Sequence, residues 1–427
     1  MIKKPKGTYD VYGDYGKKVL YLENIWQMLM EKYNYEYIRT PVFEASEVFL
    51  RGVGEGTDIV SKETYNFLDR GKREMTLRPE GTAAVVRSFI ENKMTNRPQE
   101  PIKLWYFAPM FRYERPQSGR FREHYQFGVE VLKGEYPLID AEVISIAVNF
   151  FKILGLKGIK VNINTLGDQE SRAQYNQVLV SYLEKNKEKL SAESKKRLTK
   201  NPLRILDSKE AEDQPIIKDA RKIKDYLNEE SQAFFNKLKT YLNYLEITYQ
   251  EKDNLVRGLD YYTHTVFEIE ADIEGFGSQN VLCGGGRYDG LVETLGGPPT
   301  KGIGFGLGIE RLITALDYEK INIVFDEIDA YVASLSSNEA LYAFRLANDL
   351  RMNGFRVDFD LIGRNIKNIF KNSERLKAKF VILIGEDEIK KDEFTIKNNK
   401  TKEEYKVNSQ YIVSFLEEKL GEVDVEI

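Results

Sequence analysis

The chain has few residues of the kinds that build disulfide bonds or zinc sites. Its 427 residues include one cysteine, Cys283, and two histidines, His124 and His264. A single cysteine excludes a disulfide within the chain and fits a reducing compartment. A zinc site made of imidazoles and thiolates needs more ligands than these three residues supply. We therefore expect no resident metal in the protein; a Mg²⁺ ion held by carboxylates or by a bound nucleotide is the more natural metal for this composition.

Long apolar runs and a strong charge of either sign are also missing. No apolar stretch approaches the roughly 18 residues of a membrane span, and the first ten residues, MIKKPKGTYD, lack the apolar segment of a secretory signal. These features predict a cytoplasmic protein without membrane contacts. The net charge of −4 argues against attraction to nucleic acid over the whole surface. A polyanionic partner must then be bound by local basic patches.

The hydrophobic pattern divides the chain into three parts. A first domain, residues 1–325, alternates aromatic strands with helices, and within it residues 168–235 have the polar, helical spacing of an inserted subdomain. From residue 326 to 427, strands alternate with helices, which is typical of a small, mostly parallel α/β sheet. The predicted fold class is an α+β domain on an antiparallel sheet, with a helical insertion and a C-terminal α/β domain.

Arginines crowd a predicted hairpin formed by the strands 103–113 and 125–132. Four guanidinium groups lie on or between these strands, at Arg112, Arg115, Arg120 and Arg122. Like charges across a hairpin repel unless they share an anion, and guanidinium forks match phosphate oxygens. The sequence therefore predicts a phosphate site here. The alternative is a ladder of surface salt bridges with nearby acids.

The stretch LVRGLDYYTHTVFE, Leu255–Glu268, predicts a polar turn that leads into a strand. Arg257 is suited to gripping an anion, while Tyr261 and Tyr262 offer ring faces and hydroxyls. A surface turn with a paired arginine is the alternative interpretation. Only the other motifs of the chain decide between a ligand-binding turn and a surface turn.

Three more motifs lie around this stretch. LRPEGTA places Glu80 and Thr82 in a turn, where an acid serves either as a helix cap or as a ligand. GGGRYDGL, from Gly284, allows close backbone approach but is a weak signal alone. KGIGFGLGIERL, from Lys301, has alternating glycines that leave one strand face bare, so that a flat purine or a packed helix can lie on it. It has neither the Lys-Ser/Thr of a Walker A loop nor the spacing of a Rossmann fingerprint.

Taken in order, these motifs resemble the histidyl-tRNA synthetases, a family of class II aminoacyl-tRNA synthetases. The resemblance rests on the arginine hairpin, RGLDYY, GGGRYDGL and GIGFGLGIERL, with YEYIRTPVFE (Tyr35–Glu44) as the first class II motif and NPLRILDSK in the insertion. It covers essentially the whole chain, so it implies that residues 1–325 are the catalytic domain and residues 326–427 an anticodon-binding domain. It also implies a homodimer formed through the segment 14–44.

The function implied by the resemblance is that of a histidine–tRNA ligase. Histidine and ATP form histidyl-adenylate and pyrophosphate, and the histidyl group then passes to the 3′ end of tRNA. Mg²⁺ is held by the ATP phosphates. The implied catalytic residues are Arg112 and Arg257, which flank the α-phosphate and the histidine carboxylate. No general base is needed, because the attacking carboxylate is already ionised, so catalysis rests on positioning and electrostatics.

The family pattern also assigns the binding residues. Glu130 and Tyr262 are expected to recognise the imidazole, and Glu80 and Gln126 the ammonium group. The implied histidine site comprises Glu80, Gly81, Thr82, Arg112, Gln126, Glu130, Arg257, Tyr261, Tyr262 and Tyr288. The implied ATP site comprises Arg112, Arg120, His124, Arg257 and Arg311, and the tRNA acceptor end is expected at Arg115 and Gln117.

Three positions depart from the family pattern, and two rival functions share the scaffold. His124 and Tyr125 stand where family members commonly have Phe-His, so we expect the smaller His124 ring to stack on adenine or the adenine to lie differently. His264 replaces a frequent arginine, and we interpret it as structural. One rival is a non-enzymatic RNA-binding or signalling protein built on the same scaffold. The nearer rival is the catalytically silent paralogue that regulates ATP phosphoribosyltransferase. That paralogue generally lacks the anticodon-binding domain, which this chain has.

Overall fold

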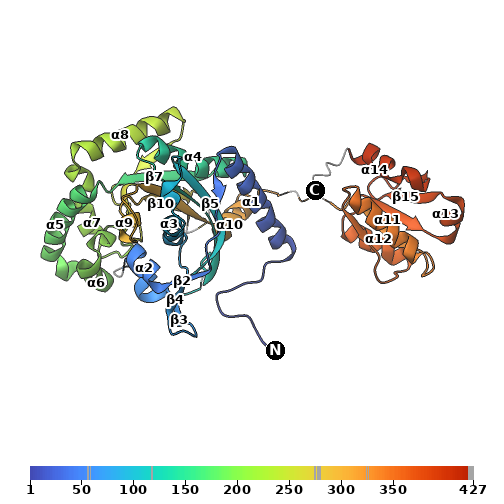
Figure 1. Ribbon diagram of the computed structural model, residues 1–427, viewed down its shortest axis with the longest axis horizontal. Coiled ribbons are helices and arrows are strands. Elements are labelled where there is room, and N and C mark those ends of the chain that lie inside the picture. The colour runs from blue at the N-terminus through green and yellow to red at the C-terminus, as the bar shows by residue number, and fades with distance from the viewer. Residues whose placement is uncertain are drawn as a thin grey trace. The chain divides into compact units, whose positions relative to one another are not determined.

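The computed structural model describes residues 1–54, 57, 59–116, 119–273, 276, 280–323, 325 and 327–421. It divides into two compact units, Met1–Ile323 and Val324–Ile427 (Figure 1). None of the described helices is long and apolar enough to cross a membrane. Each unit has a sheet and hydrophobic cores of its own.

The first unit is built on an eight-stranded sheet in the order β1-β5-β6-β11-β10-β9-β7-β8. The strands are β1 (Glu36–Tyr37), β5 (Ile102–Phe111), β6 (Glu123–Leu132), β7 (Ile159–Thr165), β8 (Tyr249–Glu251), β9 (Thr263–Ala271), β10 (Val281–Arg287) and β11 (Gly302–Gly308). The six central strands pair antiparallel, and only the short edge strands β1 and β8 pair parallel to their neighbours. The predicted antiparallel sheet is therefore confirmed.

Four helices bury their apolar sides in the largest core of this unit. They are α1 (Gly13–Lys32), α4 (Pro137–Ile153), α8 (Glu229–Tyr244) and α10 (Ile309–Tyr318). In α1 the buried residues include Leu22, Trp26 and Leu29, which are spaced by one helical turn. The Trp26 ring lies 5.1 Å from that of Phe127 on β6 and 4.9 Å from that of Phe150 on α4. This core fixes one face of the sheet and leaves the other for a site.

Smaller elements pack around the opposite face of the sheet. A three-stranded sheet has the order β2-β4-β3, and short helices adjoin it. The elements are β2 (Phe43–Ala45), α2 (Ser46–Val53), η1 (Ile59–Glu63), β3 (Tyr65–Leu68), β4 (Glu74–Leu77), α3 (Thr82–Glu91), η2 (Met94–Asn96) and α9 (Leu291–Thr294). Residues of α3, β5 and α9 share one buried cluster, so the start of α3 lies against the sheet.

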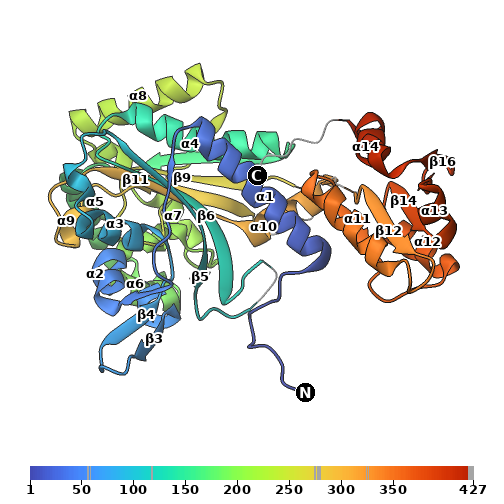
Figure 2. The ribbon, with the colours of Figure 1, turned by 45° about the vertical axis from the view of Figure 1, so that its right-hand side comes forward.

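The predicted helical insertion follows β7 and has a core of its own. Its elements are α5 (Gln169–Lys185), η3 (Lys187–Lys189), α6 (Ala192–Lys200), η4 (Pro202–Asp207), α7 (Gln214–Asp219) and η5 (Ile223–Tyr226). Asp213 ties it together, because its Oδ2 accepts hydrogen bonds from the hydroxyls of Ser191, Ser194 and Ser208 at 2.8, 2.6 and 2.5 Å. The next helix, α8, continues across residue 235 to Tyr244 and packs into the main core instead. Figures 1 and 2 both show α6 beside α2.

The second unit is a five-stranded sheet in the order β13-β12-β14-β15-β16. Its first three strands are parallel, as predicted, and the last two are antiparallel. The elements are β12 (Ala330–Ser334), α11 (Ala340–Met352), β13 (Val357–Phe359), α12 (Ile366–Arg375), β14 (Phe380–Ile384), α13 (Glu386–Lys391), β15 (Phe394–Asn398), β16 (Glu404–Val407), η6 (Ser409–Tyr411) and α14 (Ile412–Leu420). Two buried clusters cover the two faces of the sheet, one with α11 and α14 and the other with α12.

Candidate active site

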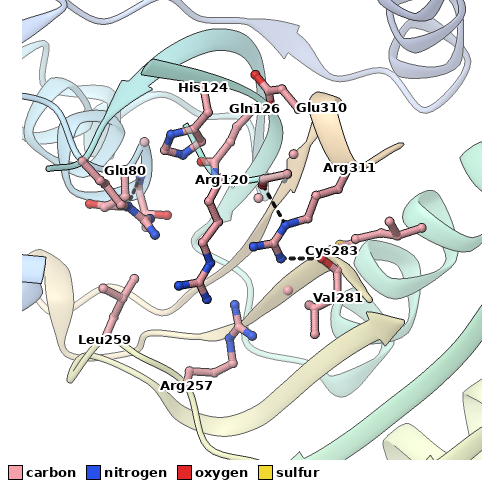
Figure 3. A pocket seen from close by; sticks show the side chains of 18 of the residues that line it. Glu80, Arg120, His124, Gln126, Arg257, Leu259, Val281, Cys283, Glu310 and Arg311 are labelled. Atoms are coloured by element: carbon pink, nitrogen blue, oxygen red, sulfur yellow. Dashed lines mark hydrogen bonds between the residues drawn. The ribbon is translucent and has the colours of Figure 1, made fainter. Parts of the chain in front are cut away.

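A pocket opens over the middle of the main sheet, on the face away from the large core (Figure 3). Strands β6, β10 and β11 form its floor, and the start of α3, the arginine hairpin, the stretch before β9 and the start of α10 form its walls. The pocket brings together eleven of the predicted site residues: Glu80, Gly81, Thr82, Arg112, Arg120, His124, Gln126, Arg257, Tyr261, Tyr262 and Arg311. Segments that are separated by more than 200 residues of sequence thus meet in one place.

Three predicted site residues lie outside the pocket lining, and the position of a fourth is not described. Glu130 and Tyr288 are buried beneath the pocket rather than among its lining residues. Arg115 is exposed on the hairpin loop, and Gln117 lies outside the described residues. The prediction that His264 is structural fits its position, because it is absent from the pocket lining and its ring centroid lies 5.1 Å from that of Phe234.

The glycines of β11 give room to side chains from neighbouring segments. A Cβ atom on Gly304 would lie 1.9 Å from Glu130 Oε2, and one on Gly302 would lie 2.3 Å from a ring carbon of Tyr288. Only Gly306 and Gly308 face the pocket. The interpretation of the bare strand face as a seat for a purine or a helix is therefore wrong for the first two glycines, where the space is already filled.

Glu130 is the most buried acid beside the pocket, with 0% of its surface exposed. The Thr82 hydroxyl donates to its Oε1 at 2.7 Å, and the Tyr288 hydroxyl donates to its Oε2 at 2.7 Å. Burial raises the pKa of Glu130 to about 8, even though both hydroxyls favour the ionised form. The carboxyl group is thus largely protonated at neutral pH.

Glu80 serves as the cap of α3 while it lines the pocket. Its Oε2 accepts from the backbone N–H of Thr82 at 2.7 Å, and its Oε1 accepts from that of Ala83 at 2.8 Å. These bonds satisfy two of the free N–H groups at the helix start. Burial raises the pKa of Glu80, and the same hydrogen bonds and the charge of Arg112 oppose that rise. The cap and the ligand interpretations are therefore compatible, because each carboxylate oxygen has a second lone pair.

Positive charge is concentrated at the other end of the pocket. Figure 3 shows the guanidinium ends of Arg120, Arg257 and Arg311 pointing into a shared space. Arg311 donates to the carbonyl oxygens of Val281, at 2.9 Å, and Gly119, at 3.3 Å. Burial lowers the pKa of Arg311, and the charge of Arg120 lowers it further. Such an arrangement favours an anion between the guanidinium groups.

Arg257 has one acidic partner and one free position. Its Nη1 donates to Glu268 on β9, and its Nε is buried without a hydrogen-bond partner among the described residues. Burial opposes its charge, but the Glu268 carboxylate raises the pKa of Arg257 above the usual value. The guanidinium lies over Gly284, where a Cβ atom would be 2.3 Å from Nη2. Gly284, the first glycine of GGGRYDGL, thus leaves space for the Arg257 side chain.

The other hairpin arginines have separate surroundings. Arg112 Nε donates to the carbonyl oxygen of Pro79 at 2.8 Å, and Arg120 forms an ion pair with Glu114 at 3.3 Å. Arg122 turns away and lies over the Tyr113 ring, 3.8 Å from its centroid. The predicted cluster of four therefore contributes two arginines, Arg112 and Arg120, to the pocket.

His124 stands between the positive groups with a neutral ring. Burial, together with the charges of Arg112 and Arg311, lowers the pKa of His124 to about 3. Its Nδ1 is buried and has no hydrogen-bond partner among the described residues. A neutral ring with an unused nitrogen is suited to contact with a heterocycle rather than with a phosphate.

Sequence reasoning missed several lining residues, among them Tyr106, Glu114, Phe121, Cys283 and Glu310. Glu310 precedes Arg311 and accepts hydrogen bonds from the Tyr9 hydroxyl, at 2.5 Å, and the Tyr125 N–H, at 2.7 Å. Its position directly before Arg311 in the GIERL motif was the sequence signal that could have identified it. Tyr106 fills space left by two glycines, since a Cβ on Gly81 or Gly128 would lie 2.4 or 2.1 Å from its ring. Among the described residues there is no group of three or more His, Cys, Asp or Glu suited to a metal ion.

Comparisons with known proteins give the family of the chain. Residues 7–312 match the family Histidyl-tRNA synthetase, and residues 329–419 match the family Anticodon binding domain. The chain is 48% identical over 421 residues to the histidine–tRNA ligase of Oceanobacillus iheyensis, covering 98% of both chains. It is 49% identical over 418 residues to that of a Geobacillus species, covering 98% of this chain and 99% of the relative. A crystal structure of apo Staphylococcus aureus histidyl-tRNA synthetase is similar, with 42% identity, a TM-score of 0.84 and coverage of 97% of this chain and 100% of that one. The chain therefore belongs to the histidyl-tRNA synthetase family.

Proposed function

We propose that this chain is an ATP-dependent histidine–tRNA ligase, which forms histidyl-adenylate and then transfers histidine to the 3′ end of its tRNA. The observation that carries the proposal is a single pocket with two chemically different ends. One end has three converging guanidinium groups, and the other has tyrosines and buried carboxyl groups. An amino acid and a nucleoside triphosphate need these two environments side by side.

The histidine end uses groups that can match an imidazole and an ammonium. We assign the ammonium to Glu80 and Gln126, and the imidazole to Tyr262 and Glu130, with Gly81, Thr82, Tyr261 and Tyr288 completing the site. Glu130 lies one layer below the lining, but its proton at neutral pH gives it an O–H to donate. A neutral imidazole has one acceptor and one donor nitrogen, so a hydroxyl and a carboxyl can satisfy both.

The arginine end stabilises the charge that develops during activation. The histidine carboxylate attacks the α-phosphorus of ATP, a new C–O–P bond forms, and pyrophosphate leaves. We assign Arg112 and Arg257 to the α-phosphate and the histidine carboxylate, and Arg120 and Arg311 to the remaining phosphates. Preorganised cations in a dry pocket act most strongly where negative charge grows. His124 is assigned to the adenine.

Mg²⁺ is proposed to arrive on the ATP phosphates. Such an ion needs only one or two protein carboxylates, and those of Glu114 and Glu310 line the pocket. When bound, the ion neutralises phosphate charge. The residues of the chain orient the two substrates and exclude water.

The proposal also covers tRNA binding, the formation of a homodimer and the location of the protein in the cell. Arg115 and Gln117 are assigned to the acceptor end, and the second unit to the anticodon. A homodimer through the segment 14–44 is supported by its exposed apolar side chains, namely Leu20, Met28, Tyr37, Val42 and Phe43. A cytoplasmic location is supported by the single thiol, Cys283, which is buried and unpaired.

The alternative is the silent regulatory paralogue, and histidine-dependent ATP–pyrophosphate exchange distinguishes the two. The full-length relatives named histidine–tRNA ligase favour the enzyme. We expect exchange by the purified chain and charging of tRNA; no exchange would refute the ligase. Arg257→Ala should slow activation by about 10²–10³-fold, while Arg345→Ala, on a side chain 84% exposed in α11, should not.

A further inference from the structure

The stretch that carries Arg257, Tyr261 and Tyr262 packs on the insertion. Leu255, Val256 and Tyr262 belong to the hydrophobic cluster of the insertion, with Tyr175 and Leu179 of α5 and with Leu203, Ile205 and Leu206 of η4. Leu259 and Tyr261 pack against the same cluster. We call residues 255–262 the histidine loop. Tyr261 and Leu259 also pack against two smaller clusters, which contain residues of α3 and α2. The apolar support of the loop thus comes mainly from the insertion and not from the large core beneath the sheet.

A single arginine of the insertion makes the main polar tie to this loop. Arg172, on α5, donates from Nη1 to the carbonyl oxygen of Asp260 at 2.8 Å and to that of Tyr262 at 2.9 Å. These two carbonyls bracket Tyr261. Burial lowers the pKa of Arg172, and the charge of Asp260 opposes that shift. The guanidinium stays charged, because arginine titrates far above neutral pH.

A second polar contact comes from the residue that follows α6. The side-chain amide of Asn201 donates to the Asp260 carboxylate. The loop also approaches Arg204 closely, since a Cβ atom on Gly258 would lie 2.6 Å from Arg204 Nη1. On the catalytic side, the corresponding bond is longer, from the Asp260 N–H to the Val53 carbonyl oxygen at 3.3 Å. The catalytic part also holds the start of the loop, through Asn164 to the Leu255 carbonyl oxygen at 3.0 Å and through Glu268 to Arg257. Around Tyr261, however, the insertion supplies the shorter polar contacts, from Arg172 and Asn201.

We infer that Arg172 is a positioning residue for histidine, which holds the backbone on both sides of Tyr261 and thereby places Tyr261 and Tyr262 in the pocket. Arg172 does not line the pocket itself. The inference rests on the proposed function, because it assumes that histidine occupies the tyrosine end. Through Arg172, the insertion would help to position the residues that bind the amino acid. Within the part of the chain that the structure describes, Arg172 makes no hydrogen bond or ion pair with the arginine end of the pocket, on β6, the hairpin and α10.

The test measures histidine binding and ATP use separately in the full-length protein. Isothermal titration with histidine alone gives Kd for wild type, Arg172→Ala, Arg172→Lys and Asn201→Ala. Pyrophosphate exchange gives KM for each substrate. We expect Arg172→Ala to weaken histidine binding by about tenfold or more, because two charge-assisted hydrogen bonds are lost, and to leave KM for ATP within about twofold. Lysine keeps one donor group without the planar fork and should restore part of the affinity.

The matched control is Arg221→Ala, also in the insertion. Arg221 donates to the Tyr226 hydroxyl at 3.2 Å, and among the described residues its side chain has no hydrogen bond to the histidine loop. This variant should bind histidine as wild type does. Asn201→Ala loosens the loop from α6 and keeps the inference testable where Arg172→Ala fails to fold.

Three outcomes would overturn the inference. Unchanged histidine affinity in the folded Arg172 and Asn201 variants would do so. An equal rise in both KM values, accompanied by a fall in melting temperature, would make Arg172 a purely structural residue. Wild-type protein that neither binds histidine nor catalyses exchange would refute the proposed function and this inference with it, whereas an active wild type with unaffected variants refutes the inference alone.

Discussion

Substitution of Glu130 by glutamine gives a sharp test of the electrostatics beneath the pocket. The side chain is fully buried, and both oxygens accept hydrogen bonds, from Thr82 and Tyr288. Gly304 leaves no spare room, because a Cβ atom there would lie 1.9 Å from Glu130 Oε2. Glutamine has nearly the same shape and removes the titration, but its NH2 group replaces one accepting oxygen, so the Thr82 or Tyr288 hydroxyl that faces it must turn to accept instead. That hydrogen-bond change does not depend on pH, so it shifts the stability of the variant equally at every pH.

The magnitude follows from the pKa of Glu130, which burial raises from 4.5 to about 8. Between these two values the folded protein holds a proton that the unfolded chain has released. The stabilisation is therefore fully present below about pH 4.5 and is lost as the pH rises through about 8. Each pH unit in this window costs about 1.4 kcal/mol. From about pH 6.5 to about pH 8, wild type should lose about 2 kcal/mol of unfolding free energy, and Glu130→Gln should lose none of this.

Urea unfolding followed by tryptophan fluorescence is the suitable assay. The two tryptophans, Trp26 and Trp105, both lie in the first unit and are buried, so their signal does not report on the second unit. Other titrating groups cancel in the difference between the two proteins. Glu188→Gln, on a side chain 95% exposed in the insertion, serves as the control and should follow wild type. Parallel pH profiles for wild type and Glu130→Gln would refute a raised pKa at this site.

Three further substitutions test other parts of the structure. Asp140→Asn removes the nearer of the two carboxylates paired with the fully buried Arg287, at 2.7 Å, and leaves Asp289 at 3.2 Å; it should cost about 3 kcal/mol in the same urea assay, and a loss near zero would contradict an ion-paired core. Gly284→Ala puts a methyl group 2.3 Å from the Arg257 guanidinium and should lower the exchange rate about 10²-fold by displacing it, with normal rates showing that the guanidinium position is unimportant. Tyr9→Phe removes a 2.5 Å hydrogen bond to the carboxylate at the start of α10 and should cost about 1.5 kcal/mol or more of stability, which Tyr12→Phe, on an exposed ring, should not.

Local patterns were sufficient to predict the strands and the residue types of the pocket. Alternating apolar residues predicted the β5–β6 pair, and that pairing places Gln126 opposite Ala108 and His124 opposite Met110. The register of a hairpin follows from its turn and its apolar face. Arg112 and Arg120 therefore reach the pocket as expected, whereas Arg122 turns to the Tyr113 ring, a contact that depends on the loop conformation.

What the sequence could not predict depends on contacts between distant segments. Tyr9 and Glu310 are 301 positions apart, and their hydrogen bond follows no local period. The burial of Glu130 arises because Thr82, Tyr288 and Gly304 meet around it from three separate segments. Residue type alone indicated a ligand; only the packing shows that its carboxyl group lies a layer deeper and holds a proton at neutral pH.

The two ends of the pocket rest on different supports, and Arg257 is where these supports meet. The arginine end rests on β6, the hairpin and α10, which pack on the large core, while the histidine loop packs mainly on the insertion. Arg257 belongs to the loop, yet its guanidinium is paired with Glu268 of β9 and lies over Gly284 of β10. A shift of the insertion would move Tyr261 and Tyr262 directly, whereas the ion pair would hold the Arg257 guanidinium over the sheet. The position of the imidazole would then change more than that of the α-phosphate, so a disturbance in the insertion should alter histidine affinity before it alters ATP affinity.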